Sequence, residues 1–428
     1  MMKKILTYAV SALALASCSS DSLVSDSPVN NEAPIAFNVG QRNITRGDVV
    51  SNKLEDNGYL NFGVWANKYK AADSKTGESV MVHYLVGFND ASKGYAKSEA
   101  TTGTWFYEGL GNDDSYIGTA PYVTSSTSVR EHQYLRYWDL SYNNTKFFAY
   151  APYDKEVTFT EGTDGSKIIT VPATVNQAGT DHDVIYAGTK MTNSNHDKVP
   201  LHFKHLGAKV NLKFYHNIPG YKVELLEVTS GGNDIQATPA TPGGTSYVDA
   251  HYFTKAEATI KYNDNMVPTA SVDVTGEGNS DDNLVFKLPD GSKEVPAETT
   301  GTQNYLESPT TYYAVAQPKG STTGFTFHVS FQLTAKDNNE VITVKDARVF
   351  VPASVTEAGN TTYIAAWQPN TKYTYTFKIT KDTKGTTSGA APNVDDPTVP
   401  DTPALYPIIF DNITIVDYEN DSEYTNKK

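Results

Sequence analysis

Tyr406-Pro-Ile-Ile-Phe-Asp-Asn-Ile-Thr-Ile-Val-Asp-Tyr418 lies near the end of the chain, beyond a long polar linker. Apolar residues alternate on one face up to Phe410, the phase slips over Asp411 and Asn412, and the alternation resumes at Ile413. This pattern predicts two short strand pieces joined by a bulge or bend. The stretch has no body of its own, and a strand is stable only when it pairs with another strand.

A segment near the other end of the chain resembles the start of this tail. Pro34-Ile-Ala-Phe-Asn38 and Pro407-Ile-Ile-Phe-Asp411 share the spacing of Pro, Ile and Phe, and each closes on an Asx residue. Two segments with one pattern fit the same slot in a sheet. A five-residue match in a strand-rich chain also arises by coincidence, so the shared slot is a hypothesis.

The composition indicates an all-β protein. The chain of 428 residues contains 28 Tyr and 17 Phe in short alternating runs, with 30 Gly and 21 Pro between them. Such runs are typical of strands, and no stretch has the periodicity of an amphipathic helix. The net charge of −14 argues against a nucleic-acid partner.

The length is sufficient for more than one domain, and breaks in composition suggest where the domains divide. The residues around 192–198 turn to Asn, Asp, Ser and Lys, which predicts a boundary there. The expected organisation is a signal peptide (1–17), a tether with a removable strand (18–46), an N-terminal β-sandwich (47–195), a C-terminal β-sandwich (196–381), a flexible linker (382–405) and a C-terminal donor strand (406–428).

The first residues form a targeting segment. A basic start at Lys3 and Lys4 precedes an apolar stretch that ends in Leu15-Ala-Ser-Cys18. This ending resembles a bacterial lipobox, which implies cleavage before Cys18 and lipid attachment to that residue. An ordinary signal peptide with an incidental cysteine is the alternative. Because Cys18 is the single cysteine, the fold has no internal disulfide.

The sequence contains none of the common catalytic or phosphate-binding motifs, so we expect no enzyme activity, no cofactor and no metal site. His202 and His205 are the most suggestive pair. Residues three apart on a strand point to opposite faces, so these two rings do not chelate one metal ion. We expect His205 to be hydrogen-bonded near the core and His202 to be exposed.

Two further short motifs have weak signals. Asp281 and Asp282 lie in a loop that fits a calcium site, although a solvated turn is the simpler interpretation. Arg46-Gly-Asp48 spells an integrin-type tripeptide, and cleavage after Arg46 would destroy it.

The tryptophans have two interpretations, as core residues or as a sugar-stacking platform on a loop. Trp105 and Trp138 lie beside the most irregular loops and are the better candidates for exposure, whereas Trp65 and Trp367 lie near predicted strands. We favour the core for all of them.

Four features occur in order along the chain: the lipobox at Cys18; Ile35-Ala-Phe37 followed by Ile44-Thr-Arg46; Tyr137-Trp138 followed by Phe147-Phe-Ala-Tyr-Ala-Pro152; and Leu201-His-Phe-Lys-His-Leu-Gly-Ala-Lys-Val210. With these features the chain resembles the fimbrillin family of Bacteroides-type bacteria, the subunits of lipoprotein-derived (type V) pili. The resemblance implies two tandem transthyretin-like β-sandwiches. It also implies export as an outer-membrane lipoprotein that later joins a cell-surface fimbrium with a role in adhesion.

The resemblance implies in addition how the subunit is activated. An arginine-specific surface protease cuts between Arg46 and Gly47, and the subunits then polymerise by strand exchange. The partners would be other copies of the chain and related pilus subunits, with the membrane contacted only through lipid on Cys18. The removable strand would present Ile35, Phe37 and Val39, and the donor strand Ile408, Phe410, Ile413 and Ile415.

A chain with both a cleavable strand and a tail fits the shaft of the pilus, although tip-adjacent and accessory positions remain open. We expect Ile35 and Phe37 to be buried in the precursor and the tail to pack poorly against its own body. The alternative function is a surface lipoprotein that binds glycans through loop aromatics and does not polymerise.

Overall fold

We describe the protein from a computed structural model, which defines residues 33–41, 54–70, 75–90, 103–110, 133–179, 183–194, 196–230, 235–237, 247–249, 254–273, 285–308, 313–316, 325–357, 359–380 and 408–417. These residues form 24 strands and one short 3-10 turn, η1 (Leu54–Asn57). None of them lies in an α-helix, so the predicted all-β class is confirmed. Within these residues no helix is long and apolar enough to cross a bilayer.

The largest sheet contains seven strands in the order β1-β9-β8-β5-β2-β3-β4. Their bounds are β1 (Phe37–Gln41), β2 (Asn61–Tyr69), β3 (Glu78–Phe88), β4 (Trp105–Phe106), β5 (Asn144–Ala151), β8 (Ile185–Thr192) and β9 (Val199–His205). Every residue of β5 is buried, because this sheet is covered on both faces. Such strands are continuously apolar instead of alternating, as Phe147 to Ala151 shows.

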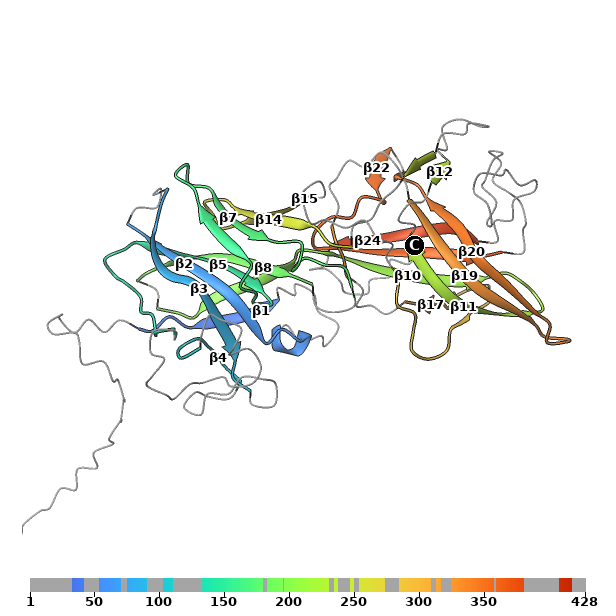
Figure 1. Ribbon diagram of the computed structural model, residues 1–428, viewed down its shortest axis with the longest axis horizontal. Helices are drawn as coiled ribbons and strands as arrows, with labels where there is room; N and C mark the ends of the chain where they lie inside the picture. The colour runs from blue at the N-terminus through green and yellow to red at the C-terminus, as the bar shows by residue number, and fades with distance from the viewer. Residues whose placement is uncertain are drawn as a thin grey trace, which may run out of the picture.

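A second sheet, with the order β15-β14-β7-β6, covers one of these faces. Its strands are β6 (Thr158–Glu161), β7 (Lys167–Val171), β14 (Glu257–Tyr262) and β15 (Pro268–Asp273). Trp65, Phe148 and Tyr150 of the large sheet pack there against Ile169 and Ile260. We call the two sheets together the N-terminal body (Figure 1, left).

The sequence suggested a domain boundary between residues 195 and 196, but the sheets are not divided there. β9 pairs with β8 in the N-terminal body, and β14 pairs there with β7. The polar residues around 192–198 therefore connect two neighbouring strands of one sheet. Turns within a sheet and linkers between domains are rich in the same polar residues, so composition alone does not distinguish them. The chain leaves the N-terminal body after His205, and it returns there for β14 and β15.

The C-terminal body also contains two sheets (Figure 1, right). One has the order β17-β10-β23-β24, with β18 also on β10, and the other has the order β16-β11-β19-β20. The bounds are β10 (Ala208–His216), β11 (Tyr221–Ser230), β16 (Glu294–Val295), β17 (Leu306–Glu307), β18 (Tyr313–Ala314), β19 (Phe325–Ala335), β20 (Val341–Val351), β23 (Thr371–Ile379) and β24 (Ile408–Asp417). Two small hairpins, β12 (Ile235–Ala237) with β13 (Tyr247–Asp249) and β21 (Ser354–Glu357) with β22 (Asn360–Tyr363), lie outside these sheets.

The two larger sheets of the C-terminal body enclose one apolar core. Residues from both sheets, including Leu212, Phe327 and Phe377, are fully buried in it, and so is Trp367. The face-to-face packing of antiparallel and mixed sheets around a shared core is that of a β-sandwich.

Candidate functional site

The segment 33–41, which ends in β1, is hydrogen-bonded on both sides. It runs parallel to β9, from the pair Phe37 and Val199 to the pair Gln41 and Phe203. On its other side, the Ile35 N–H donates to the Arg136 carbonyl oxygen at 2.8 Å, and the Trp138 N–H donates to the Ala33 carbonyl oxygen at 3.1 Å. We call this slot, between β9 and residues 136–138, the groove.

Alternation directs three apolar side chains of the segment 33–41 into the core. Ile35, Phe37 and Val39 are 2%, 5% and 8% exposed, whereas Asn38 points to solvent. Full burial of such side chains is worth about 1.5 to 3 kcal/mol each. The strand is thus a well-packed part of the N-terminal body.

Phe37 sits in an aromatic box. Its ring lies edge-on to Phe62, Tyr107 and Phe147, with centroid distances of 5.5, 6.0 and 6.0 Å. Edge-to-face pairs are favourable because the positive ring edge meets the negative ring face. The Tyr107 hydroxyl also donates to the Ile35 carbonyl oxygen at 2.9 Å, and burial raises the pKa of Tyr107, so this donor remains protonated.

The tail forms β24, which pairs antiparallel with β23 from Ile379 and Ile408 to Thr371 and Asp417. Asp411 is the extra residue of a bulge in this ladder, so the predicted phase slip is confirmed. The bulge restores the phase of the strand. It thereby turns one set of side chains toward the C-terminal core: Ile408, Phe410, Ile413 and Ile415.

Our expectation that the tail packs poorly against its own body was wrong. Ile408 is only 2% exposed, and Phe410 lies 6.3 Å from Phe377 between ring centroids. The expectation failed because β23 is an apolar strand that needs a neighbour on its outer edge, and β24 provides it. β1 and β24 lie in different bodies of the molecule (Figure 1).

The docked tail nevertheless leaves space beside it. A cavity of about 570 Å³ lies along β24, and its walls include Phe410, Ile413 and Ile415 together with Val355 and Ile364. The first three are only partly buried. β24 ends its sheet, and apart from Ile408 its apolar side chains are less well covered than those of β1.

Other residues singled out from the sequence prove structural. His205 is buried and its Nδ1 lies 2.7 Å from Asp183 Oδ1, while His202 is exposed, as predicted. The Tyr59 hydroxyl donates to the same carboxylate. Within the described ranges no group of three or more His, Cys, Asp or Glu residues is placed to hold a metal ion.

The tryptophans do not form a sugar-stacking platform. Trp65, Trp138 and Trp367 are buried, and Trp105 is half-buried against the core of the N-terminal body. Large exposed aromatic side chains are found instead at Tyr134, Tyr137 and Tyr363. The glycan-binding alternative therefore loses the residues on which it was based.

Several predicted sites lie outside the described residues. They are the lipidation site Cys18, the cleavage site Arg46 and Gly47 with Asp48, and the loop residues Asp281 and Asp282.

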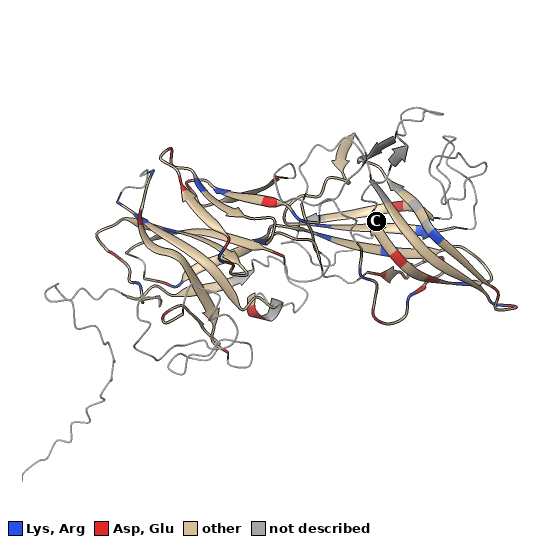
Figure 2. Ribbon diagram, viewed as in Figure 1, with Lys and Arg blue, Asp and Glu red and all other residues tan. Residues whose placement is uncertain are grey.

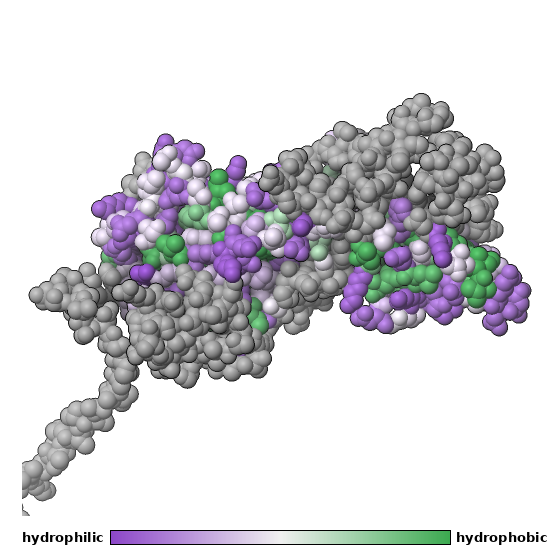
Figure 3. Space-filling view, in the orientation of Figure 1, coloured by the Kyte–Doolittle hydropathy of each residue, from purple (hydrophilic) through white to green (hydrophobic). Residues whose placement is uncertain are grey.

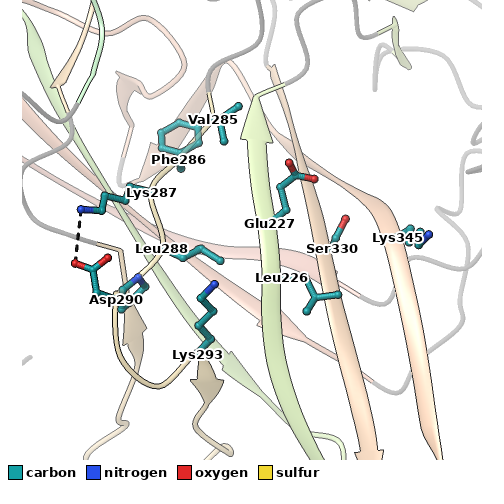
Figure 4. A pocket seen from close by; sticks show the side chains of 11 residues that line it. Leu226, Glu227, Val285, Phe286, Lys287, Leu288, Asp290, Lys293, Ser330 and Lys345 are labelled. Carbon is teal, nitrogen blue, oxygen red and sulfur yellow. Dashed lines mark ion pairs between the residues drawn. The ribbon is translucent and has the colours of Figure 1, made fainter.

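A cavity of about 870 Å³ lies on the C-terminal body (Figure 4). Its walls combine apolar side chains such as Leu226 with charges of both signs, Glu227 and Lys293 among them. Lys287 pairs with Asp290 at 3.6 Å on its rim. We find no ordered set of polar groups there that selects one ligand.

The surface charge is also mixed. Lys and Arg alternate with Asp and Glu over both bodies (Figure 2), and hydrophobic residues are interspersed with hydrophilic ones on the visible face (Figure 3). No continuous basic stripe is drawn on the coloured part of the chain, and such a stripe is what nucleic-acid binding needs.

The walls of the groove were not foreseen from the sequence. Phe62, Tyr107 and residues 136–138 come from three distant parts of the chain, and only the fold brings them together. The Tyr137-Trp138 and Phe147-Phe148 motifs were the available signal, because both supply residues around Phe37.

Residues 89–392 match a family model described as "Fimbrillin-like". The chain belongs to this fimbrillin-like family. Residues 2–19 match a prokaryotic membrane lipoprotein lipid attachment site. This fimbrillin-like protein is therefore a surface lipoprotein of the cell-surface fimbria. No curated protein matches the chain.

One solved structure has a similar fold. A fimbrial protein from Bacteroides vulgatus is 16% identical, with a TM-score of 0.53 over 90% of this chain and 99% of that chain. A "putative cell adhesion protein" from Bacteroides uniformis is 14% identical, with a TM-score of 0.37 over 90% of this chain and 99% of that chain. At these identities the likeness to the first structure concerns the fold alone.

Proposed function

We propose that this fimbrillin-like protein is a structural subunit of the pilus shaft that polymerises by strand exchange. The observation that carries the proposal is that the segment 33–41 buries three apolar side chains and precedes a basic site at Arg46. A protease that cuts after Arg46 would separate β1 from the rest of the chain. The lipid on Cys18 would leave with it.

Loss of β1 would open the groove. β9 would become the edge of its sheet, and Phe62 and Phe147 would lose the ring that they enclose. An open edge beside an apolar slot is a strong template for a strand of matching pattern. The tail of another copy supplies this pattern, with Ile408 and Phe410 in the places of Ile35 and Phe37.

Moving to the groove would bury more of the apolar surface of the tail. On its own body Phe410 is only partly buried, whereas Phe37 in the groove is 5% exposed. Burial of Ile408, Phe410, Ile413 and Ile415 in the groove is worth roughly 6 to 12 kcal/mol before the ordering entropy is subtracted. The docked tail must first leave β23, which lowers the net gain by the contacts it gives up there.

The test is proteolysis of the folded precursor with an arginine-specific protease, followed by N-terminal sequencing and gel electrophoresis. We expect a mature chain that begins at Gly47 and a ladder of polymers. Arg46→Ala should abolish both results, whereas the neighbouring control Arg42→Ala should leave the Gly47 end and the ladder intact.

A second arm tests the donor strand. Phe410→Asp should permit cleavage but prevent the ladder, because a carboxylate in the groove loses its hydration without gaining a partner. Thr414→Asp is the matched control, since Thr414 is exposed on β24. Normal polymers from Arg46→Ala or Phe410→Asp would contradict strand exchange. Mature protein that keeps lipidated Cys18 on cells would favour the non-polymerising lipoprotein.

A further inference from the structure

Strand exchange, if it occurs as proposed above, leaves a second slot empty. β24 pairs along the whole of β23, from Thr371 to Ile379, and Ile408 covers the core at one end. When the tail moves to a neighbour, β23 becomes the edge of its sheet. An edge of nine residues over an apolar core tends to pair with any strand that fits it.

We propose that this slot is refilled by the strand that cleavage releases, Ala33 to Gln41 of a second copy, which we call the plug. Plug and tail share the Pro-Ile-x-Phe-Asx pattern. Each exchange step releases one plug and vacates one β23 slot, so the two are available in equal numbers. The polymer then contains two strand substitutions for each step instead of one.

The register of the plug on β23 follows from that of the tail. Ile35 takes the place of Ile408 opposite Ile379, and Phe37 takes the place of Phe410 opposite Phe377. The plug has no phase slip, so Val39 then faces Tyr375 on the same side. These three side chains are the ones that β1 buries in the groove.

The side chains of the plug that point away from the core also fit this register. Ala36 takes the place of Ile409, which is 45% exposed, and Asn38 takes the place of the exposed Asn412 opposite Thr376. No charge of the plug enters the core in this register, because residues 33–41 contain no charged side chain. A shift of two residues keeps the same side chains of the plug facing the core. In the direction that places Ile35 opposite Phe377, however, it leaves only the small Ala33 opposite Ile379.

The slot has room for a different strand. The cavity of about 570 Å³ beside the docked tail shows that Phe410, Ile413 and Ile415 do not fill the space in front of Ile364 and Val355. The tail is therefore not the only strand shape that this edge accommodates.

The experiment uses the uncleaved chain lacking residues 406–428 and carrying Cys18→Ser, which removes the single cysteine. Its groove is still occupied by its own β1, so an added plug peptide, Ala33 to Gln41 with a fluorescent label, reports only the β23 slot. We expect saturable binding by fluorescence anisotropy, and binding at least about tenfold weaker for the peptide with Phe37→Asp. An Asn38→Asp peptide is the matched control and should bind within about twofold of the original.

Cross-linking then tests the register. A plug peptide with Ala36→Cys should form a disulfide with a chain that carries Lys378→Cys, because these positions face each other in the proposed ladder. Thr374→Cys lies four residues away and should react far more slowly. If the shortened chain does not fold, the full chain with Ile408→Asp and Phe410→Asp takes its place, because a carboxylate at the buried Ile408 position opposes docking of the tail on β23.

The outcomes separate this inference from the proposed function. Absence of plug binding, or equal cross-linking at both positions, overturns the inference. A tail peptide, Leu405 to Tyr418, is tested in parallel on the shortened chain before and after cleavage, and the binding that is gained on cleavage reports the groove. Binding of the tail peptide to the groove without binding of the plug peptide to β23 would support strand exchange and contradict the refilling of the β23 slot. Absence of tail binding to the groove would contradict strand exchange itself.

Discussion

The Tyr215 hydroxyl donates a hydrogen bond of 3.0 Å to Oδ2 of Asp411, the residue that the bulge in β24 adds to its ladder. Burial and this carboxylate raise the pKa of Tyr215. The bond joins the docked tail to β10, which is not its direct neighbour in the sheet. It therefore fixes the tail at the one position where the ladder with β23 is irregular.

Tyr215→Phe should loosen the docked tail. A hydrogen bond of this kind is worth about 0.5 to 1.5 kcal/mol, and its loss should speed amide hydrogen exchange in β24 more than in β23. Because a raised folded-state pKa stabilises the folded form below pH 10 and this stability is lost as the pH rises further, the variant should also lose less stability in alkali. Tyr363→Phe is the control, since Tyr363 is 43% exposed. Equal exchange in both variants would contradict the role of the bond.

Phe37→Ala should destabilise the uncleaved precursor. The ring is 5% exposed and is surrounded by Phe62, Tyr107 and Phe147, so its removal leaves a cavity and costs about 3 to 5 kcal/mol. Thermal unfolding measures the change. Asn38→Ala on the same strand should alter stability by less than about 0.5 kcal/mol, because Asn38 is exposed. Similar losses for both variants would mean that β1 does not seal the groove.

Ile408→Ala should lower the stability of the C-terminal body by about 2 to 5 kcal/mol, since Ile408 is 2% exposed. Ile409→Ala is a stringent control, because Ile409 is the next residue and is 45% exposed. Chemical denaturation of the monomer distinguishes the two. Should neither substitution change the midpoint, the tail does not dock on β23 in solution.

The buried ring of His83 should make the protein less stable in acid. Its ring stacks on Trp65 at 4.3 Å, and burial lowers the pKa of His83 to about 4. The unfolded chain binds a proton near pH 6.5, so the folded form loses stability as the pH falls from there to about 4. His83→Asn tolerates the same backbone conformation, with φ at 51°, and should flatten this decline in pH-dependent unfolding. An unchanged slope would assign the decline to other groups.

Local pattern was sufficient for most strands. The bounds of β7 (Lys167–Val171) can be read from the sequence, because Ile169 and Val171 alternate and the turn-forming Gly165 and Pro172 flank the strand. The polar strand β15 (Pro268–Asp273) cannot be recognised from its own residues, since pairing with β14 makes it a strand. Residues 285–288 have an apolar pattern that is typical of a strand, but among them only Val285 makes an isolated bridge.

For the candidate site, the two strand segments could be predicted from the sequence, but the residues that surround them in the fold could not. Alternation identified Ile35, Phe37 and Val39 as an inward face, and the phase slip at Asp411 located the bulge. Which edge the tail pairs with depends on β23, which lies beyond a 24-residue linker spanning 382–405 by sequence. Long-range pairing of this kind leaves no trace in local periodicity.

The covalent link between β1 and the rest of the N-terminal body has a kinetic consequence. While residues 42–53 join the strand to the body, β1 returns to the groove as an intramolecular ligand, at an effective concentration of about millimolar. No free tail competes well against that. One peptide-bond hydrolysis converts β1 into a separate molecule that diffuses away or is retained elsewhere, and the same groove becomes accessible to strands present at far lower concentration. Proteolysis would thus activate the subunit by turning an intramolecular contact into an intermolecular one, with no change in the shape of the groove.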